Sequence, residues 1–127
     1  MFKNREPHFD GDYFFKDEAI AASEKVSDAF RLGNTQSGLR VRGWVEGTAA
    51  STAGGTISVT LEVGDESAAD GTWEVIAADT ATATGTTITG DIFSYVPDTD
   101  KKFMRVKVQG VAGITGTFSV APEYVAR

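Results

Sequence analysis

The first group of residues that could bind a metal or act as a catalytic base surrounds one histidine. His8 is the single histidine of the 127 residues, and Asp10 and Asp12 follow it at alternate positions. Such a set could ligate a metal ion, and an acyl-transfer triad would need this same histidine. No helical or strand period surrounds it, and ligands need a fixed geometry with supporting hydrogen bonds. We therefore expect no metal ion and no nucleophilic triad here.

A second acidic segment holds Asp65, Glu66 and Asp70 between two expected strands. Carboxylates of this kind bind calcium, but the segment lacks the full spacing of a calcium loop, and acids in a strand connection are usually solvated. No glycine-rich phosphate loop opens a helix, and no pair of carboxylates stands out in an aromatic groove, as a glycoside hydrolase would need. We predict that the protein is not an enzyme and needs no cofactor and no metal.

Two rows of cationic and aromatic residues are more informative. Alternation places Arg40, Arg42 and Trp44 on one face of a strand, and Phe103, Arg105 and Lys107 on one face of another. If the two strands share a sheet, the rows form a single patch of the type found at protein interfaces. The patch would suit an acidic protein surface, or a sugar stacked on Trp44. The alternative is a solvated face with cross-strand ion pairs to Glu46 or Glu62.

The N-terminal stretch differs from the rest of the chain, and we assign residues 1–25 to an arm. Pro7 and Gly11 interrupt any regular element, and a cation at Arg5 lies among several aromatic residues. One interpretation is a tail that packs on its own domain. We favour an arm that docks on a sister copy or on another protein, because so many aromatic rings are costly to leave in water. The aromatic residues concerned are Phe2, Phe9, Tyr13, Phe14 and Phe15.

The elements that must position these residues are strands. In 56–63, Ile57, Val59, Leu61 and Val63 alternate strictly with polar residues, and Gly-rich turns flank the segment. This strand has one apolar face, which requires a second layer to cover it. Residues 79–86, rich in Thr, Ala and Gly, predict a polar edge strand or a long loop. Further strands are expected at 26–32, 39–46, 72–77, 87–96, 102–109 and 115–125. The residues predicted to share the inward face of a strand are Val26, Phe30 and Leu32; Leu39, Val41, Gly43 and Val45; Met104, Val106 and Val108; and Phe118 and Val120, and alternation also groups Trp73, Val75 and Ala77 on one face.

These elements predict one all-β domain over 26–127, an antiparallel two-sheet sandwich of jelly-roll type with about eight strands and an extended N-terminal arm. An immunoglobulin sandwich is the second choice. The length suits a single domain, and the chain has no cysteine. A formal net charge of -6 argues against nucleic acid as a partner. We expect no membrane-spanning segment and no signal peptide.

Three stretches carry a resemblance to a known family. They are the segment from Ser27 to Gly33, the segment from Gly54 to Val63 with its continuation from Asp70 to Ile76, and the segment from Val96 to Val120. Together they resemble the small jelly-roll cement, or decoration, proteins of tailed bacteriophage capsids. In that family a strand like Gly-Gly-Thr-Ile is followed by an acidic loop, a proline turn and an arginine-bearing strand. The longer loop at 64–71 and the aromatic arm depart from the pattern.

The resemblance implies a homo-oligomer, dimer or trimer, that binds the outside of an icosahedral shell and clamps neighbouring subunits of the major capsid protein. It places the protein on the capsid surface of a virion, after synthesis in the host cytoplasm, with no nucleic acid and no membrane as partners. We expect capsid or subunit contacts from the arm residues and from the two rows on the strands. The alternative function is a carbohydrate-binding or adhesion module, with Trp44 or Trp73 as the platform for a sugar ring.

Overall fold

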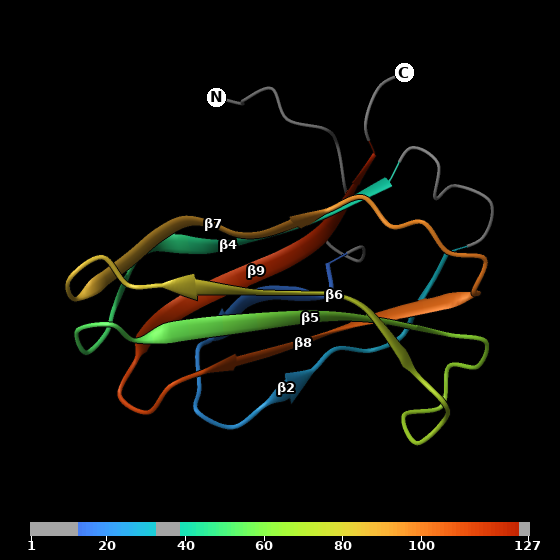
Figure 1. Ribbon diagram of the computed structural model, residues 1–127, viewed down its shortest axis with the longest axis horizontal. Helices are drawn as coiled ribbons and strands as arrows, with labels where there is room; N and C mark the ends of the chain where they lie inside the picture. The colour runs from blue at the N-terminus through green and yellow to red at the C-terminus, as the bar shows by residue number, and fades with distance from the viewer. Residues whose placement is uncertain (1–12, 33–38, 125–127) are drawn as a thin grey trace.

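The computed structural model describes residues 13–32 and 39–124, and these residues form an all-β structure (Figure 1). The described part holds no helix, and therefore none that could cross a membrane. Its strands are β1 Phe15–Ala19, β2 Lys25–Val26, β3 Phe30–Arg31, β4 Leu39–Ala50, β5 Thr56–Gly64, β6 Glu74–Thr82, β7 Thr87–Tyr95, β8 Phe103–Gly110 and β9 Thr115–Tyr124.

The strands form two antiparallel sheets whose pairing is nested along the chain. The first sheet has the order β1-β9-β4-β7, and the second has the order β2-β8-β5-β6, with β3 also paired to β8. Thus β1 pairs with β9, β2 and β3 with β8, β4 with β7, and β5 with β6. This is one long antiparallel hairpin folded over into two layers, which is the connectivity of a jelly roll. The predicted fold class is confirmed.

The core lies between the two sheets and is built from alternate residues of the strands. The four apolar residues predicted to line one face of β5 are all fully buried, at 0% exposure. On β8 the predicted inward residues Met104, Val106 and Val108 are also buried, and on β9 Phe118 and Val120 are at 0%. Period-two alternation therefore identifies the buried face of these strands correctly, because each side chain either enters the layer between the sheets or leaves it.

The strand β4 is longer than predicted, and one glycine in it serves packing. Leu39, Val41 and Val45 point into the core as expected, and the strand continues to Ala50. A Cβ added to Gly43 would lie 3.3 Å from Val120 and 3.4 Å from Ile92. Gly43 thus lets the neighbouring strands β9 and β7 bring their aliphatic side chains against the backbone of β4.

The start of the sandwich differs from the prediction in two ways. Residues 15–19, assigned to the arm, form β1, the edge strand that pairs with β9. The domain therefore begins before the expected boundary at residue 26. In addition, the strand expected over 26–32 is two short strands, β2 and β3, separated by three residues. Val26 was predicted to point inward, but it lies on the outer face and is 45% exposed.

The strand β6 forms the other edge of the second sheet, so the edge strand predicted over 79–86 exists as far as Thr82. A register shift lies between Leu61 and Glu62: Leu61 pairs with Ala77, whereas Glu62 pairs with Val75. One extra residue in β6 therefore reverses the facing of the strand, as β-bulges do. Val75 is 54% exposed as a result. The predicted grouping of Trp73, Val75 and Ala77 on one face is thus wrong.

Candidate functional site

The two rows of cations and aromatic residues do not meet. Arg40, Arg42 and Trp44 lie on β4 in the first sheet, whereas the row from Phe103 to Lys107 lies on β8 in the second. Both rows point away from the core, so they lie on opposite outer faces of the sandwich. The condition for a single patch, that the two strands share a sheet, is therefore not met, and each face has to be considered by itself.

On the outer face of the first sheet, Arg42 joins two carboxylates from neighbouring strands. Its Nε and Nη2 donate to Asp91 Oδ1 at 3.1 and 2.8 Å, and its Nη1 donates to Glu123 Oε2 at 3.0 Å. The hydrogen bonds to Asp91 raise the pKa of Arg42 above its ordinary value, against the opposing effect of burial, and the hydrogen bond to Glu123 raises it further. Glu123 is only 2% exposed, so Arg42 compensates a buried charge. Arg40 lies opposite Glu123 in the register of β4 and β9.

Trp44 packs against the same group. The guanidinium of Arg42 lies 4.8 Å from the ring centroid, and the ring of Tyr13 approaches edge-on at 6.2 Å. The Trp44 indole N–H donates to Glu46 Oε2 at 2.9 Å, and Ser119 Oγ donates to the same oxygen at 2.6 Å. Trp44 is half-buried among these partners. Its ring is therefore a structural part of this face and offers little flat surface for a sugar.

On the outer face of the second sheet, Glu62 of β5 forms ion pairs with two cations of the row on β8. Arg105 Nε donates to Glu62 Oε1 at 2.7 Å, and Lys107 Nζ lies 3.5 Å from Glu62 Oε2. Lys107 also lies 3.8 Å from Glu24, and Arg31 covers the ring of Phe103 at 5.5 Å. The cross-strand ion pairs to Glu62 that the alternative interpretation required are thus present. Glu62 is 7% exposed, which makes this pair far less solvated than an ordinary surface ion pair.

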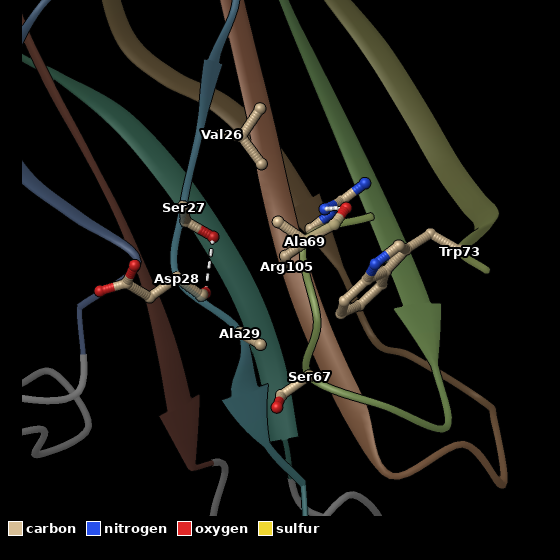
Figure 2. Close-up of a pocket in the computed structure, with 8 residues that line it drawn as sticks. All are labelled: Val26, Ser27, Asp28, Ala29, Ser67, Ala69, Trp73 and Arg105. Atoms are coloured by element: carbon tan, nitrogen blue, oxygen red, sulfur yellow. Dashed lines mark hydrogen bonds between the residues drawn. The ribbon is translucent and has the colours of Figure 1, made fainter. Parts of the chain in front are cut away.

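Beside this row the surface is hollowed into a groove of about 220 Å³, which we call the Trp73 groove. The break between β2 and β3 forms one wall, the loop at 67–69 forms the other, and Arg105 lies between them (Figure 2). Arg105 lies 4.3 Å from the Trp73 ring centroid, and its Nη1 donates to the carbonyl of Ala69 at 2.9 Å. The Trp73 indole N–H donates to the carbonyl of Ala68 at 3.0 Å. Arg105 and Trp73 thus hold the loop in place over the sheet. The residues that line the groove are Val26, Ser27, Asp28, Ala29, Ser67, Ala69, Trp73 and Arg105.

The wall formed by the break in the strand is held by one serine. Ser27 N–H donates to the carbonyl of Val106 at 2.9 Å, and Ser27 Oγ accepts the N–H of Val106 at 2.9 Å. The hydroxyl therefore takes the place of a strand carbonyl, and the backbone of Asp28 is released from the ladder. Figure 2 shows the Asp28 carboxylate directed away from Arg105. The polar groups of the groove are thus few, and its walls are small side chains.

The acidic loop forms a separate hollow of about 250 Å³, lined by Asp65, Glu66, Thr72 and Lys101. Lys101 Nζ lies 3.3 Å from Asp65 Oδ2, and this hydrogen bond raises the pKa of Lys101 above its ordinary value. Within 13–32 and 39–124 no three acidic or histidine side chains come together as a metal site would require. His8, Asp10 and Asp12 lie outside the described residues.

The expected arm contacts fall into two groups. Phe2, Arg5 and Phe9 lie outside the described residues. Phe15 is buried at 8% exposure and packs on Phe118 with ring centroids 5.1 Å apart. Phe14 packs on Phe30 at 5.5 Å. These two aromatic residues, like Tyr13 on Trp44, pack on the protein's own sandwich, and Phe15 is not accessible to a partner.

Sequence reasoning placed the β8 row outward but did not include Glu62, Ser27 or Trp73 among the expected contact residues. Glu62 could have been found, since it is the one acid among the outward residues of the central strand. Ser27 could not, because its role depends on a break in the strand. Trp73 was considered only as a sugar platform, and its contact with Arg105 depends on the loop that precedes it.

Comparison with known proteins yields little. No family model matches the chain, and no curated protein matches it. A solved structure described as "Crystal structure of PirA" is similar over 86% of this chain and 91% of its own, with 18% sequence identity and a TM-score of 0.43. A likeness at that level carries no argument about family or function.

Proposed function

We propose that this protein is a structural virion protein that binds the outside of a bacteriophage capsid and cements neighbouring subunits of the major capsid protein. The observation that carries the proposal joins sequence and fold. The segments that resemble capsid cement proteins fall on β3, on β5 and β6, and on β8 and β9, whereas β4 and β7 carry no part of the resemblance. The resemblance thus extends over strands of both sheets, and this extent is what supports the proposal.

The surfaces suit a protein that holds others by shape. On each outer face one arginine, Arg42 or Arg105, is joined to a buried carboxylate, so these charged pairs stiffen the sheets. A binder of this kind gains from many copies, since avidity multiplies modest contacts on a lattice. Self-association and the major capsid protein are the partners that this function needs, and it requires no cofactor and no enzymatic activity.

The test uses capsids stripped of the protein and the purified full-length chain. We expect the chain to sediment with mature capsids to a fixed copy number per shell and to raise their resistance to heating. Removal of residues 1–12 tests the docking role of the arm, and it spares Phe15, which the core needs. A matched control replaces residues 1–12 by a Gly/Ser segment of equal length.

Loss of binding in both the truncated and the replaced chain, with unchanged circular dichroism, would assign capsid docking to the arm. Full occupancy by both would remove the arm from the interface and leave the cementing role intact. Failure of the full-length chain to bind any capsid would contradict the proposed function itself.

A carbohydrate-binding module is the second candidate, and one observation favours it. Trp73 lines a groove of about 220 Å³ beside Arg105, and an aromatic ring with nearby polar groups is a common platform for a sugar. If this function holds, Trp73→Ala abolishes glycan-array binding, whereas Trp44→Ala leaves the same glycans bound. Equal loss in both variants, or no glycan binding by the unmodified protein, would exclude the groove as a sugar site.

A further inference from the structure

Three cations form a row on the outer face of the second sheet. Arg105 and Lys107 point outward from β8, and Arg31 of β3 lies opposite Phe103 on the same face. Successive outward positions along β8 are about 6.6 Å apart, so one extended anion can follow the three charges. Glu62 is buried beside Arg105 and Lys107, whereas Arg31 is exposed and forms no ion pair within the described residues. In a chain with a net charge of -6, this row is a place where an anionic ligand is attracted.

Arg105 is fixed in place, and part of its guanidinium has no partner. Its Nε donates to Glu62 and its Nη1 to the carbonyl of Ala69, and its side chain is only 11% exposed. In residues 13–32 and 39–124 no group accepts a hydrogen bond from Nη2. Two hydrogen bonds thus fix the plane of the guanidinium, and the remaining donors line the Trp73 groove. A planar guanidinium held in this way matches the two oxygens of a carboxylate.

The groove beside these donors has an aromatic wall and room for one ring. Its volume of about 220 Å³ is below the roughly 300–1,000 Å³ of pockets that hold drug-sized molecules. It therefore suits a single small ring better than an extended peptide. Trp73 forms the wall next to Arg105, and the bond from its indole N–H to the carbonyl of Ala68 fixes the orientation of the ring. A fixed aromatic face is an apolar surface on which a sugar ring can stack.

Hydrogen-bonding groups for the hydroxyls of such a ring lie on the other walls. The hydroxyl of Ser67 lines the groove on the loop side and has no partner within the described residues (Figure 2). The backbone N–H groups of Asp28 and Ala29 also have no acceptor in this part of the chain, because the break between β2 and β3 removes them from the ladder. Since the Asp28 carboxylate is directed away from Arg105, it does not occupy the free side of the guanidinium (Figure 2). The groove therefore combines neutral polar groups with one set of cationic donors.

We infer that the Trp73 groove binds a sugar residue that carries a carboxylate, such as a uronic or sialic acid. The sugar ring lies against Trp73, its carboxylate accepts from the free N–H groups of Arg105, and Arg31 and Lys107 attract the rest of an anionic glycan. This inference rests on the carbohydrate-binding function, the second candidate function, and narrows it to acidic glycans. A neutral sugar would leave the free N–H groups of Arg105 without a partner in a partly dehydrated groove, which is costly.

The first test compares one glycan with and without its carboxylates. Chemical reduction of tetragalacturonate converts each uronate to neutral galactose and leaves the linkages unchanged. The full-length protein is applied to an array that carries both forms, sialylated and neutral glycans, and polyglutamate. We expect binding to acidic glycans, with at least about a tenfold lower affinity for their neutral counterparts.

The other outcomes separate the inference from the function on which it rests. Equal or stronger binding of neutral glycans would overturn the inference and leave carbohydrate binding intact. Binding of polyglutamate as strong as that of acidic glycans would assign the groove to carboxylates in general and overturn the sugar. Absence of binding to any glycan would contradict both the inference and the carbohydrate-binding function.

The second test replaces the fork of Arg105 and keeps its charge beside Glu62. We expect Arg105→Lys to weaken binding of the acidic glycan at least about tenfold in calorimetric titrations, because an ammonium presents no planar pair of donors. The matched control is Arg42→Lys, which makes the same change beside a buried carboxylate on the opposite face and should leave the affinity unchanged. Arg31→Ala, at an exposed position, should weaken binding about threefold and does not disturb the core. Equal losses in Arg105→Lys and Arg42→Lys, or an affinity indifferent to both Arg105→Lys and Arg31→Ala, would overturn the inference.

Discussion

At the scale of single residues, the main feature is a buried carboxylate under each row of cations. Glu123 under Arg42 and Glu62 under Arg105 are 2% and 7% exposed, and each is held by an arginine from a neighbouring strand. Such pairs contribute little compared with apolar packing, but removal of one partner is costly because the other remains buried without compensation. Substitutions on the outer faces should therefore lower the free energy of unfolding more than the polar composition of these faces indicates.

This argument predicts the effect of Glu62→Gln. The substitution keeps the shape but leaves Arg105 and Lys107 without their shared charge, so we expect the free energy of unfolding to fall by about 2 kcal/mol. Urea denaturation at neutral pH measures it. Glu24→Gln is the control, since Glu24 meets only Lys107, at 3.8 Å on the surface, and should change stability by less than about 0.5 kcal/mol. Equal losses of stability in Glu62→Gln and Glu24→Gln would show that the burial of Glu62 is not the cause.

Period-two alternation was sufficient to place Arg105 and Lys107 outward and to offer Glu62 as a cross-strand partner. It could not place Trp73 over Arg105. That contact depends on the loop that precedes Trp73 and on Gly64, where an added Cβ would lie 2.9 Å from the carbonyl of Thr72. Close approaches of this kind are set by backbone paths that leave no period in the sequence.

At the scale of elements, the break between β2 and β3 depends on Ser27. Its hydroxyl accepts the N–H of Val106, a group buried inside the second sheet. We expect Ser27→Ala to lower the free energy of unfolding by about 1–2 kcal/mol, because that N–H loses its acceptor. Ser58→Ala is the control, since its hydroxyl is exposed and meets only Thr80, and should cost less than about 0.5 kcal/mol. Amide exchange should show faster exchange at Val106 in Ser27→Ala alone.

The elements themselves were predictable to different degrees. Strands β5, β8 and β9 followed from strict alternation, since each has one face in the core. The segment from Val26 to Leu32 reads as one strand, and nothing local indicates that a serine side chain will replace a strand carbonyl. The bulge that turns Val75 outward could not be predicted either, because it depends on the register of β5 against β6. β1 was missed because its five residues show no alternation of apolar and polar side chains, and its pairing with β9 is interrupted by a register shift.

At the scale of the whole molecule, the two outer faces are separate, and this has an energetic consequence. Arg42 and Arg105 belong to different sheets, and packed sheets are about 10 Å apart, so their substitutions should not interact. We expect the effects of Arg42→Ala and Arg105→Ala on unfolding free energy to add within about 0.5 kcal/mol. Arg105 and Lys107 share Glu62, so the effects of Arg105→Ala and Lys107→Ala on the free energy of unfolding should not be additive. Double-mutant cycles in urea distinguish the two cases, and strong coupling between Arg42 and Arg105 would contradict the separation.

The sequence supported a jelly roll but not the assignment of β4 and β8 to different sheets. Which strands become neighbours depends on contacts between residues far apart in the chain, and both rows have the same local pattern. Whether the two rows form a single patch could therefore be decided only from the topology.

The nested pairing also governs how this protein can be made. Among the described strands β1 is the first in the chain, and its one partner there is β9, the last, so β1 cannot pair until β9 has been synthesised. Until then the apolar faces of β5 and β8 have no complete second layer. Folding that depends on such distant partners is slow and exposes strands that can aggregate. We conclude that nascent chains stalled before β9 should be insoluble and sensitive to protease, whereas release of the finished chain should restore resistance in one cooperative step.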